Sequence, residues 1–270
     1  MRAFASRHIA ITFAVIAFAL PIAYGLTLDP IDISLRDGLR APSTMHLLGT
    51  DQLGRDLLAR IAHAFIVDLR LALICVTASL VLGVLFGVAS AEFGRAIDSA
   101  LVFAMDVLVA LPQIVVAVVL AAYLGGGEVA LIIALSLTGW VRYARITRAQ
   151  TMQLRDAEFI TVARVTGASR LRILRRHIVP NVVPPLASLV ALQFGHTILN
   201  IAALGFLGLG VQPPTAEWGV MISEARPYLG RAPGLAIDPG LFLFGFTCIC
   251  LALARTRRST DPSGDAVAAA

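Results

Sequence analysis

The sequence predicts an all-α membrane protein with six transmembrane helices. Hydrophobic residues make up 58% of the 270 positions, charged residues only 14%, and the mean hydropathy is +0.83. A soluble globule could not carry this composition on its surface. The 22 basic residues are all arginine and gather at the ends of apolar segments. Topology signals of this kind explain the net charge of +5 better than nucleic-acid binding does.

Six segments are apolar enough to cross the hydrocarbon core, which takes about 20 residues, or fewer with arginines at the ends. They cover residues 9–28, 71–91, 107–124, 129–141, 186–209 and 239–254. The first is too long for a removable signal peptide and lacks a small-residue cleavage site, so we expect a retained anchor. The second contains Gly83 and Gly87, a weak indication of close helix packing.

The arginine distribution orients these spans, because short loops rich in arginine stay in the cytoplasm. With both termini cytoplasmic, segments 1–8, 92–106, 142–185 and 255–270 hold 15 of the 22 arginines. The chain then divides into four parts. They are an N-terminal tail with the first helix (1–28), an outer segment with a short amphipathic helix (29–70), a five-helix core (71–256) with a cytoplasmic loop over 148–185, and a disordered cytoplasmic tail (257–270).

The pattern of the cytoplasmic loop predicts two short helices. Residues 156–166 contain neither Pro nor Gly, so they can form a helix that Gly167 ends in the left-handed conformation. Ser169 can cap a second helix, and Pro180 and the prolines that follow are expected to stop it before the fifth span. The alternative is an ordinary arginine-rich topology loop, which the length and the Gly-to-Pro spacing disfavour.

Gly167 and Pro180 also resemble the cytoplasmic signature of ABC-importer permeases. That signature is written Glu-Ala-Ala, three residues, Gly, then nine residues to Ile-x-Leu-Pro. Its first positions read Thr161, Val162 and Ala163 in this chain, so Ala163, Gly167 and Pro180 keep the signature residue and the first two positions do not.

Four flanking blocks, in the expected order, resemble the dipeptide, oligopeptide and nickel branch of that family in its C-type subunit. They lie at 46–56 (His-Leu-Leu-Gly-Thr-Asp-Gln-Leu-Gly-Arg-Asp), 139–145, 175–181 and 206–219. Two stretches depart from the family pattern. Residues 64–69 read Ala-Phe-Ile-Val-Asp-Leu where the family has Gly-x-Arg-x-Ser-Leu, and the chain from 237 onward lacks the usual Gly-Asp-Gly-Leu-Arg-Asp close.

The resemblance implies a type I ABC-importer permease in the cell inner membrane, surrounded by the lipid bilayer. Its implied partners are a second homologous permease, either a distinct chain or a second copy, two cytoplasmic ATPases and an extracytoplasmic solute-binding protein. Residues 156–167 would be the coupling helix that sits in a groove of the ATPase. The coupling residues that the resemblance implies are Glu158, Thr161, Val162, Ala163, Gly167, Ala168 and Pro180.

The same resemblance implies a transport subunit without catalytic residues, cofactor, metal or nucleic acid. ATP hydrolysis is left to the partners, because a phosphate-binding loop needs a lysine and the sequence contains none. The solute stays open among peptides, nickel chelates, glutathione and opines, and we expect pathway walls that are mostly apolar and small. The rival functions are a stand-alone secondary transporter or channel, which needs ionisable residues along a midplane pathway, and a scaffold that only docks a soluble partner.

Several single residues carry further expectations. Asp106 and Pro112 are candidates for a pathway or a helix interface, and an interhelical hydrogen bond is the plainer role for Asp106. The i,i+4 pairs predict the short outer helix, and they are Asp51 with Arg55 and Asp56 with Arg60. Trp218 and Tyr228 are expected to be interfacial anchors, with docking of the binding protein as the alternative. The three cysteines, at 75, 248 and 250, are expected to be small buried hydrophobes.

Overall fold

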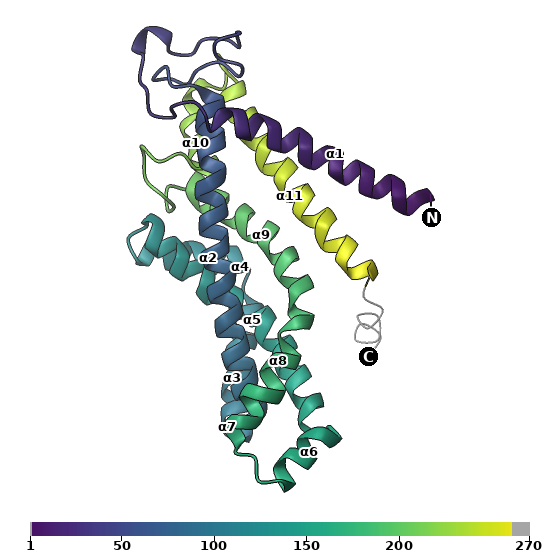
Figure 1. Cartoon of the computed structure of the whole chain (residues 1–270). Helices are drawn as coiled ribbons and strands as arrows, with labels where there is room; N and C mark the ends of the chain where they lie inside the picture. The colour runs from purple at the N-terminus through teal and green to yellow at the C-terminus, as the bar shows by residue number, and fades with distance from the viewer. Residues whose placement is uncertain (1, 261–270) are drawn as a thin grey trace.

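The computed structural model describes residues 2–260, and its elements are helices (Figure 1). The long ones are α1 (Arg2–Gly25), α2 (Leu57–Glu92), α3 (Arg95–Ala110), α4 (Gln113–Tyr123), α5 (Gly127–Arg155), α9 (Ala187–Phe206) and α11 (Gly234–Thr260). The short ones are α6 (Glu158–Val165), α7 (Arg170–Ile173), a π-helical turn (Leu174–Ile178), α8 (Val179–Val182), α10 (Trp218–Glu224) and 3-10 turns at Leu35–Asp37, Pro184–Leu186 and Arg226–Tyr228. The described residues form no β-strand, which confirms the all-α fold class.

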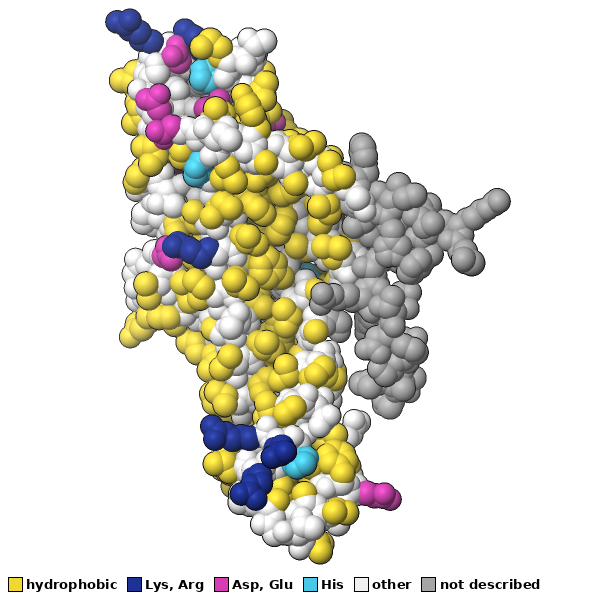
Figure 2. Space-filling view, in the orientation of Figure 1, with side chains coloured by type: hydrophobic (Ala, Val, Ile, Leu, Met, Phe, Trp, Pro, Cys, Tyr) yellow, Lys and Arg dark blue, Asp and Glu magenta, His cyan; other side chains and the backbone are white. Residues whose placement is uncertain are grey.

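The described part of the chain has four helices long and apolar enough to cross a membrane, namely α2, α5, α9 and α11. α3 and α4 add a fifth crossing if they form one broken span. The apolar part of α1, Ala14–Gly25, is shorter than these, so a sixth crossing and the sides of the termini stay predictions. Figure 2 shows apolar side chains over the middle of the visible face, with most charged side chains at its two ends.

The third predicted span, residues 107–124, is wrong as one continuous helix. α3 ends at Ala110, α4 begins at Gln113, and the two helices meet at an angle of 96°. Pro112 has no backbone N–H and disfavours helical backbone at the residue before it. Leu111 accordingly adopts an extended conformation, with φ −103° and ψ 141°. The proline that the sequence places inside the span therefore breaks it.

α2 and α5 both run well beyond the predicted spans. α2 begins at Leu57 rather than near residue 71, and the Asp56 carboxylate caps it by accepting a hydrogen bond from the Ala59 N–H. α5 continues past residue 141 to Arg155. The arginines in this extension are paired through contacts of Arg142 with Gln193, Arg145 with Asp106 and Arg148 with Asp98. Hydropathy alone therefore ends both helices too early.

α2 and α5 pack against each other along a row of small residues, with their backbones in close approach. A Cβ added at Gly87 would lie 2.6 Å from the Thr147 Cβ, and one at Gly83 would lie 2.8 Å from the Trp140 carbonyl oxygen. The contact is reciprocal, because a Cβ at Gly139 of α5 would lie 2.6 Å from the Ser79 Oγ of α2. Small residues are what membrane helices need in order to pack closely.

An aromatic cluster holds the peripheral helices to this pair. Phe18 of α1, Phe65 of α2, Trp218 of α10 and Phe246 of α11 lie with neighbouring ring centroids 5.2 to 6.2 Å apart. The Trp218 side chain is fully buried, and its Nε1 donates a hydrogen bond to the Ile61 carbonyl oxygen at 3.1 Å. The expectation that Trp218 is an interfacial anchor or docking residue is therefore wrong. Tyr228 is half-buried against the same core.

Two smaller predictions from the sequence are partly wrong. Cys75 is buried and Cys250 is half-buried, but Cys248 is exposed, so the burial predicted for Cys248 is wrong. Helix α11 continues to Thr260, which places residues 257–260 in the helix rather than in the predicted tail. The rest of that tail, residues 261–270, lies outside the described residues.

We predict that Gly83→Ala destabilises the protein by about 1–3 kcal/mol, because the added methyl group overpacks the α2–α5 contact. Gly240 is the matched control, since it is also a helical glycine but nothing lies within 4 Å of a Cβ added there. Thermal unfolding of the detergent-purified variants measures the difference. Equal apparent unfolding temperatures for Gly83→Ala and Gly240→Ala would contradict the close packing.

Candidate functional site

The loop that is predicted to be cytoplasmic, residues 148–185, forms the end of the molecule opposite the predicted outer segment, residues 29–70 (Figure 1). α6 covers Glu158–Val165, and the chain turns at Gly167 with φ +83°, where nothing lies within 4 Å of an added Cβ. A positive φ is costly for residues with a side chain, so a glycine suits this position. The helix and its glycine stop agree with the pattern of residues 156–167.

The second half of the loop differs from the prediction. α7, the π-helical turn, α8 and a 3-10 turn follow one another into α9, so the prolines do not stop the helix before the fifth span. Pro180 lies in the first turn of α8, directly after the π-helical turn Leu174–Ile178. Pro180 has no N–H to donate to the preceding turn. Because the π-helical turn before it is wider than an α-helical turn, the chain stays helical through Pro180. Ser169 occupies the N-cap of α7, but its side chain accepts no cap hydrogen bond.

A small apolar cluster holds this loop to the inner end of α2. Its buried members are Val88, Ile160, Ile173, Ile178 and Val182. Two of the predicted coupling residues, Ala163 and Ala168, are half-buried and pack against it. The loop is therefore anchored to the helix bundle by side chains from α2, α6, α7 and α8.

The other predicted coupling residues face outward. Glu158, Thr161, Val162 and Gly167 are exposed along α6 and the turn after it, and Pro180 is exposed on α8. α6 also presents three large apolar side chains to the surroundings, with exposed fractions of 45% for Phe159, 60% for Val162 and 84% for Val165. An apolar face on a short helix at the end of the molecule is unusual for a surface without a partner.

Ion pairs tie the inner ends of the helices together. Arg148 of α5 donates two hydrogen bonds to Asp98 of α3, from Nε at 2.6 Å and from Nη2 at 2.7 Å. Ser90 of α2 also donates to Asp98. Two-bond arginine–carboxylate pairs are among the stronger polar contacts in proteins. Three helices therefore meet at one half-buried carboxylate.

The loop after α5 joins the same region through Arg170, whose Nε lies 3.5 Å from Glu92 Oε2 at the end of α2. The guanidinium of Arg170 also lies over the Phe93 ring, 5.1 Å from its centroid. Asp106 lies further along α3 and accepts a hydrogen bond from Arg145 at 2.7 Å, in an exposed pair.

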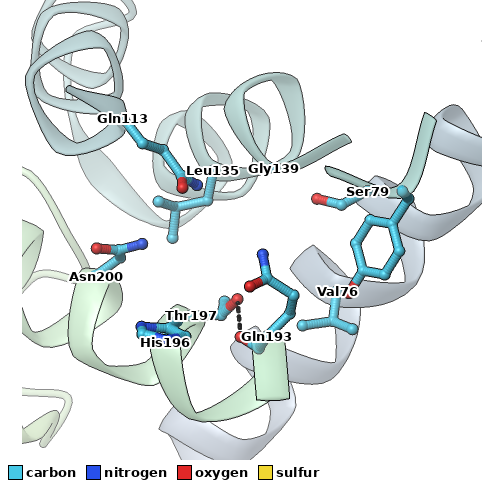
Figure 3. Close-up of a pocket in the computed structure, with 10 residues that line it drawn as sticks. Val76, Ser79, Gln113, Leu135, Gly139, Gln193, His196, Thr197 and Asn200 are labelled. Atoms are coloured by element: carbon cyan, nitrogen blue, oxygen red, sulfur yellow. Dashed lines mark hydrogen bonds between the residues drawn. The ribbon is translucent and has the colours of Figure 1, made fainter. Parts of the chain in front are cut away.

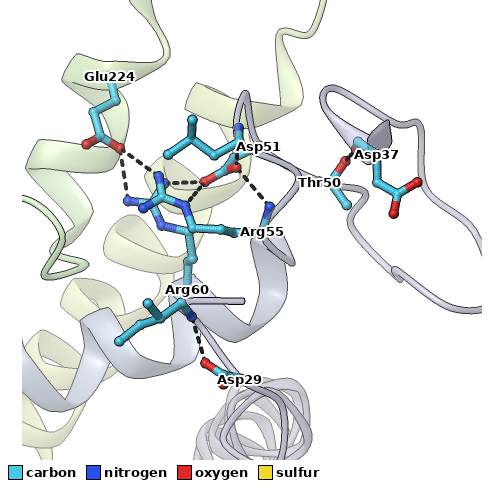
Figure 4. A network of polar contacts seen from close by, with 9 residues as sticks. Asp29, Asp37, Thr50, Asp51, Arg55, Arg60 and Glu224 are labelled. Carbon is cyan, nitrogen blue, oxygen red and sulfur yellow. Dashed lines mark hydrogen bonds and ion pairs between the residues drawn. The ribbon is translucent and has the colours of Figure 1, made fainter. Parts of the chain in front are cut away.

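A second polar network lies at the outer end of α2 (Figure 4). The Asp51 carboxylate accepts hydrogen bonds from Arg55 Nε at 2.6 Å and from Arg60 Nη1 at 2.7 Å. Arg60 Nη2 in turn donates to Glu224 of α10 at 2.9 Å. Asp51, Arg55 and Arg60 are all buried. The network joins the outer segment to α2 and to a helix more than 150 residues further along the chain.

The network corrects the predicted outer helix. Asp51 and Arg55 do pair, but Asp51 lies in a turn where its Oδ1 accepts the backbone N–H groups of Leu53 and Arg55. Asp56 does not pair with Arg60, because it caps α2 and contacts His46 Nδ1 at 2.9 Å. The i,i+4 spacing gives the pair of Asp51 with Arg55, but Arg60 pairs instead with Asp51, nine residues away, and with Glu224, 164 residues away. No local pattern identifies Glu224.

Two buried carboxyl groups lie next to Trp218. Asp68 of α2 and Glu217 at the N-cap of α10 are both fully buried, and the Glu217 oxygens accept the N–H groups of Gly219 at 2.7 Å and Val220 at 2.9 Å. Burial raises the pKa of the Glu217 carboxyl to about 7, although those two N–H groups act in the opposite direction. Asp68 stands at the position where the family pattern has Ser, so the acid pair arises at a departure from that pattern.

Comparison with known proteins supports the family resemblance over most of the chain. Residues 80–255 match the sequence family described as "Binding-protein-dependent transport system inner membrane component". Among curated proteins, the chain is 38% identical to the nickel transport system permease protein NikC of Escherichia coli K12, covering 84% of this chain and 82% of that protein. It is 41% identical to the di/tripeptide transport system permease protein DppC of Pseudomonas aeruginosa, covering 72% of this chain and 64% of that protein.

Solved structures share the fold. A chain of the MetNI methionine ABC transporter in inward-facing conformations matches with a TM-score of 0.58 at 17% identity, over 76% of this chain and 96% of that chain. A chain of an amino acid ABC transporter with histidines matches with a TM-score of 0.56 at 17% identity, over 74% of this chain and 94% of that chain.

We predict that the protein loses stability as the pH rises from about 4 to about 7, the interval between the unfolded and folded pKa values of Glu217. The pKa of Glu217 is raised to about 7 in the folded state, above the usual value of about 4.3. The folded state therefore binds more protons, and the stability that protonation confers is lost as the pH rises through the folded pKa. Thermal unfolding at each pH measures the loss.

Glu217→Gln separates this effect from other titrations. It removes the titrating carboxyl, so the unfolding temperature should fall less steeply with pH than in the wild type. Glu128→Gln is the control, because Glu128 forms an exposed ion pair with Arg70 at 2.8 Å and its loss should leave the pH dependence intact. The explanation fails if Glu217→Gln and the wild type show the same slope.

Proposed function

The chain belongs to the family of binding-protein-dependent transport system inner membrane components, and we propose that it couples solute passage to a cytoplasmic ATPase through α6. It is a permease subunit of an ATP-driven importer. Within this importer, we propose that the chain forms one half of the pathway and pairs with a second homologous permease. The proposed complex also contains two ATPases and one extracytoplasmic solute-binding protein.

The exposed apolar face of α6 carries this proposal. Phe159, Val162 and Val165 point away from the bundle, while Ile160 on the opposite face is fully buried against the cluster at the end of α2. An amphipathic helix that lays its apolar face into a groove of a partner is a common recognition mode. The family signature covers the same residues, which makes an ATPase groove the partner that fits best.

The anchoring of the loop supports a mechanical role. α6 packs on the end of α2, Arg170 reaches Glu92, and Arg148 joins α5 to α3 through Asp98. A displacement of α6 by the ATPases would therefore move the inner ends of three helices together. Packed helices that have two discrete arrangements switch between them rather than deform continuously. Closure of the ATPases would in this way change which side of the pathway is open.

The solute proposed for this importer is a short peptide or a chemically related compound. The similar proteins have names that state nickel transport for NikC and di/tripeptide transport for DppC. A stand-alone secondary transporter fits less well, because Asp106, the acid that the sequence offered for a pathway, is paired with Arg145 in an exposed contact.

We predict that Val162→Asp weakens binding of the ATPase subunits about tenfold or more, because it places an unpaired carboxylate in an apolar interface, and a tenfold loss corresponds to about 1.4 kcal/mol. The chain is expressed with its neighbouring cistrons, purified in detergent through a tag, and the retained ATPase is quantified. Met45→Asp is the control, since Met45 is equally apolar, 81% exposed and part of the outer segment. The coupling proposal is wrong if no ATPase co-purifies with the wild type, or if Val162→Asp retains as much ATPase as Met45→Asp does.

A further inference from the structure

A groove lined largely by polar side chains lies among α2, α4, α5 and α9. Figure 3 shows the amides of Gln113, Gln193 and Asn200 and the hydroxyl of Ser79 directed into a common space. His196 and Thr197 of α9 and Tyr143 of α5 complete the polar part of the lining. The expectation of mostly apolar pathway walls does not describe this groove.

The polar residues of α9 lie on one face of the helix. Gln193, His196, Thr197 and Asn200 follow the spacing i, i+3, i+4 and i+7 within a span that is otherwise apolar. Polar side chains on such a span are costly against lipid, and they usually face the bundle interior or a water-filled cavity. These four polar residues therefore face the groove. The groove, and not the stability of the helix, explains why they are polar.

Some of these groups are satisfied within the chain and some are not. Gln193 Oε1 accepts a hydrogen bond from Arg142 Nη1 at 2.6 Å, and Thr197 Oγ1 donates to the Gln193 carbonyl oxygen at 2.8 Å. Within the described residues, no side-chain hydrogen bond is formed by Gln113, His196 or Asn200.

Tyr143 independently indicates that the groove receives a polar group. Its side chain is 1% exposed and lines the groove, and its hydroxyl has no hydrogen-bond partner among the described residues. A buried hydroxyl without a partner costs about 1–3 kcal/mol. A polar ligand or water in the groove removes that cost.

The chemistry of the lining selects a class of solute. The polar groups are amides, hydroxyls and one imidazole, and the lining contains no carboxylate or cysteine. The described residues contain no group of three or more His, Cys, Asp or Glu that could hold a metal ion. Neutral donors and acceptors match the N–H and C=O groups of a peptide, whereas a bare divalent cation prefers carboxylate, imidazole or thiolate ligands.

We propose that this groove is a wall of the translocation pathway, where Tyr143, His196 and Asn200 hydrogen-bond the backbone of a short peptide in transit. The inference rests on the proposed function, to which it adds the residues that contact the solute and a preference for peptide over nickel. The space among the side chains is about 10 Å³, room for about one water molecule. A peptide therefore passes only when α9 moves away from α2, α4 and α5, which is a change that the coupling loop can drive.

The test uses the complete complex with its partner permease, ATPases and binding protein, reconstituted in liposomes. Uptake is measured with a labelled mixture of di- and tripeptides and, separately, with ⁶³Ni²⁺. The double variant His196→Leu with Asn200→Leu should take up peptides about tenfold more slowly, the loss expected for two hydrogen bonds. Its ATPase subunits should stay bound. His63→Leu on the outer half of α2 is the control, because His63 only bonds the Ala59 carbonyl of its own helix.

Cysteine labelling tests the groove without relying on transport. In a chain whose native cysteines are replaced by alanine, Asn200→Cys should react with a water-soluble methanethiosulfonate, and peptide should protect it during turnover. Ile198→Cys, on the opposite face of α9 and 1% exposed, should not react.

Three results would overturn the inference. They are normal peptide uptake by the double variant, uptake of ⁶³Ni²⁺ but not of peptides by the wild type, and an unreactive Asn200→Cys that cross-links to the partner permease instead. Each leaves the permease assignment standing, whereas a wild-type complex that retains no ATPase would refute the proposed function itself.

Discussion

The structure depends on the close approach of α2 and α5. Apolar side chains gain little from leaving lipid for a helix interface, so membrane helices rely on packing density, and small residues make that density possible. Ser79, Gly83 and Gly87 supply it on α2, with Gly139 opposite on α5. α9 then packs across this pair and forms the polar groove with it. A change in the distance between α2 and α5 would alter the shape of the groove.

Polar contacts lie at both ends of this helix pair, and those at the outer end join residues that are further apart in the sequence. At the outer end, buried Asp51 and Arg60 connect the outer segment to Glu224 of α10. At the inner end, the Asp98 carboxylate joins α3 to α5 through Arg148. Burying a charge is costly unless it is paired, so the buried outer network fixes the position of its helices. At the inner end the two hydrogen bonds between Arg148 and the half-buried Asp98 hold α5 to α3. Between the networks the helices are held mainly by packing, which permits them to change their arrangement.

The sequence predicts the local features of this structure and misses the long-range ones. The helix that ends at Gly167 follows from residue pattern alone, since a positive φ suits glycine. The missing N–H of Pro112 predicts a break in the helix, whereas hydropathy alone treats residues 107–124 as one span. Arg60 could be paired only with neighbours at i,i+4, because nothing local signals Glu224. The α9 face with His196 and Asn200 was visible as a helical spacing, and overall hydropathy obscured it. The burial of Trp218 depends on three other helices and has no local signal.

In the proposed mechanism the loop after α5 and the inner ends of α2, α3 and α5 move as one mechanical unit, and Asp98 joins α3 to α5 within it. The most direct test is the number of solute molecules transported per ATP hydrolysed by the reconstituted complex. We expect Asp98→Asn to keep its ATPase subunits and to hydrolyse ATP while transporting less solute per ATP. Glu128→Gln, which removes an exposed ion pair between α5 and α2, should keep the wild-type ratio. An unchanged ratio in Asp98→Asn would contradict the account.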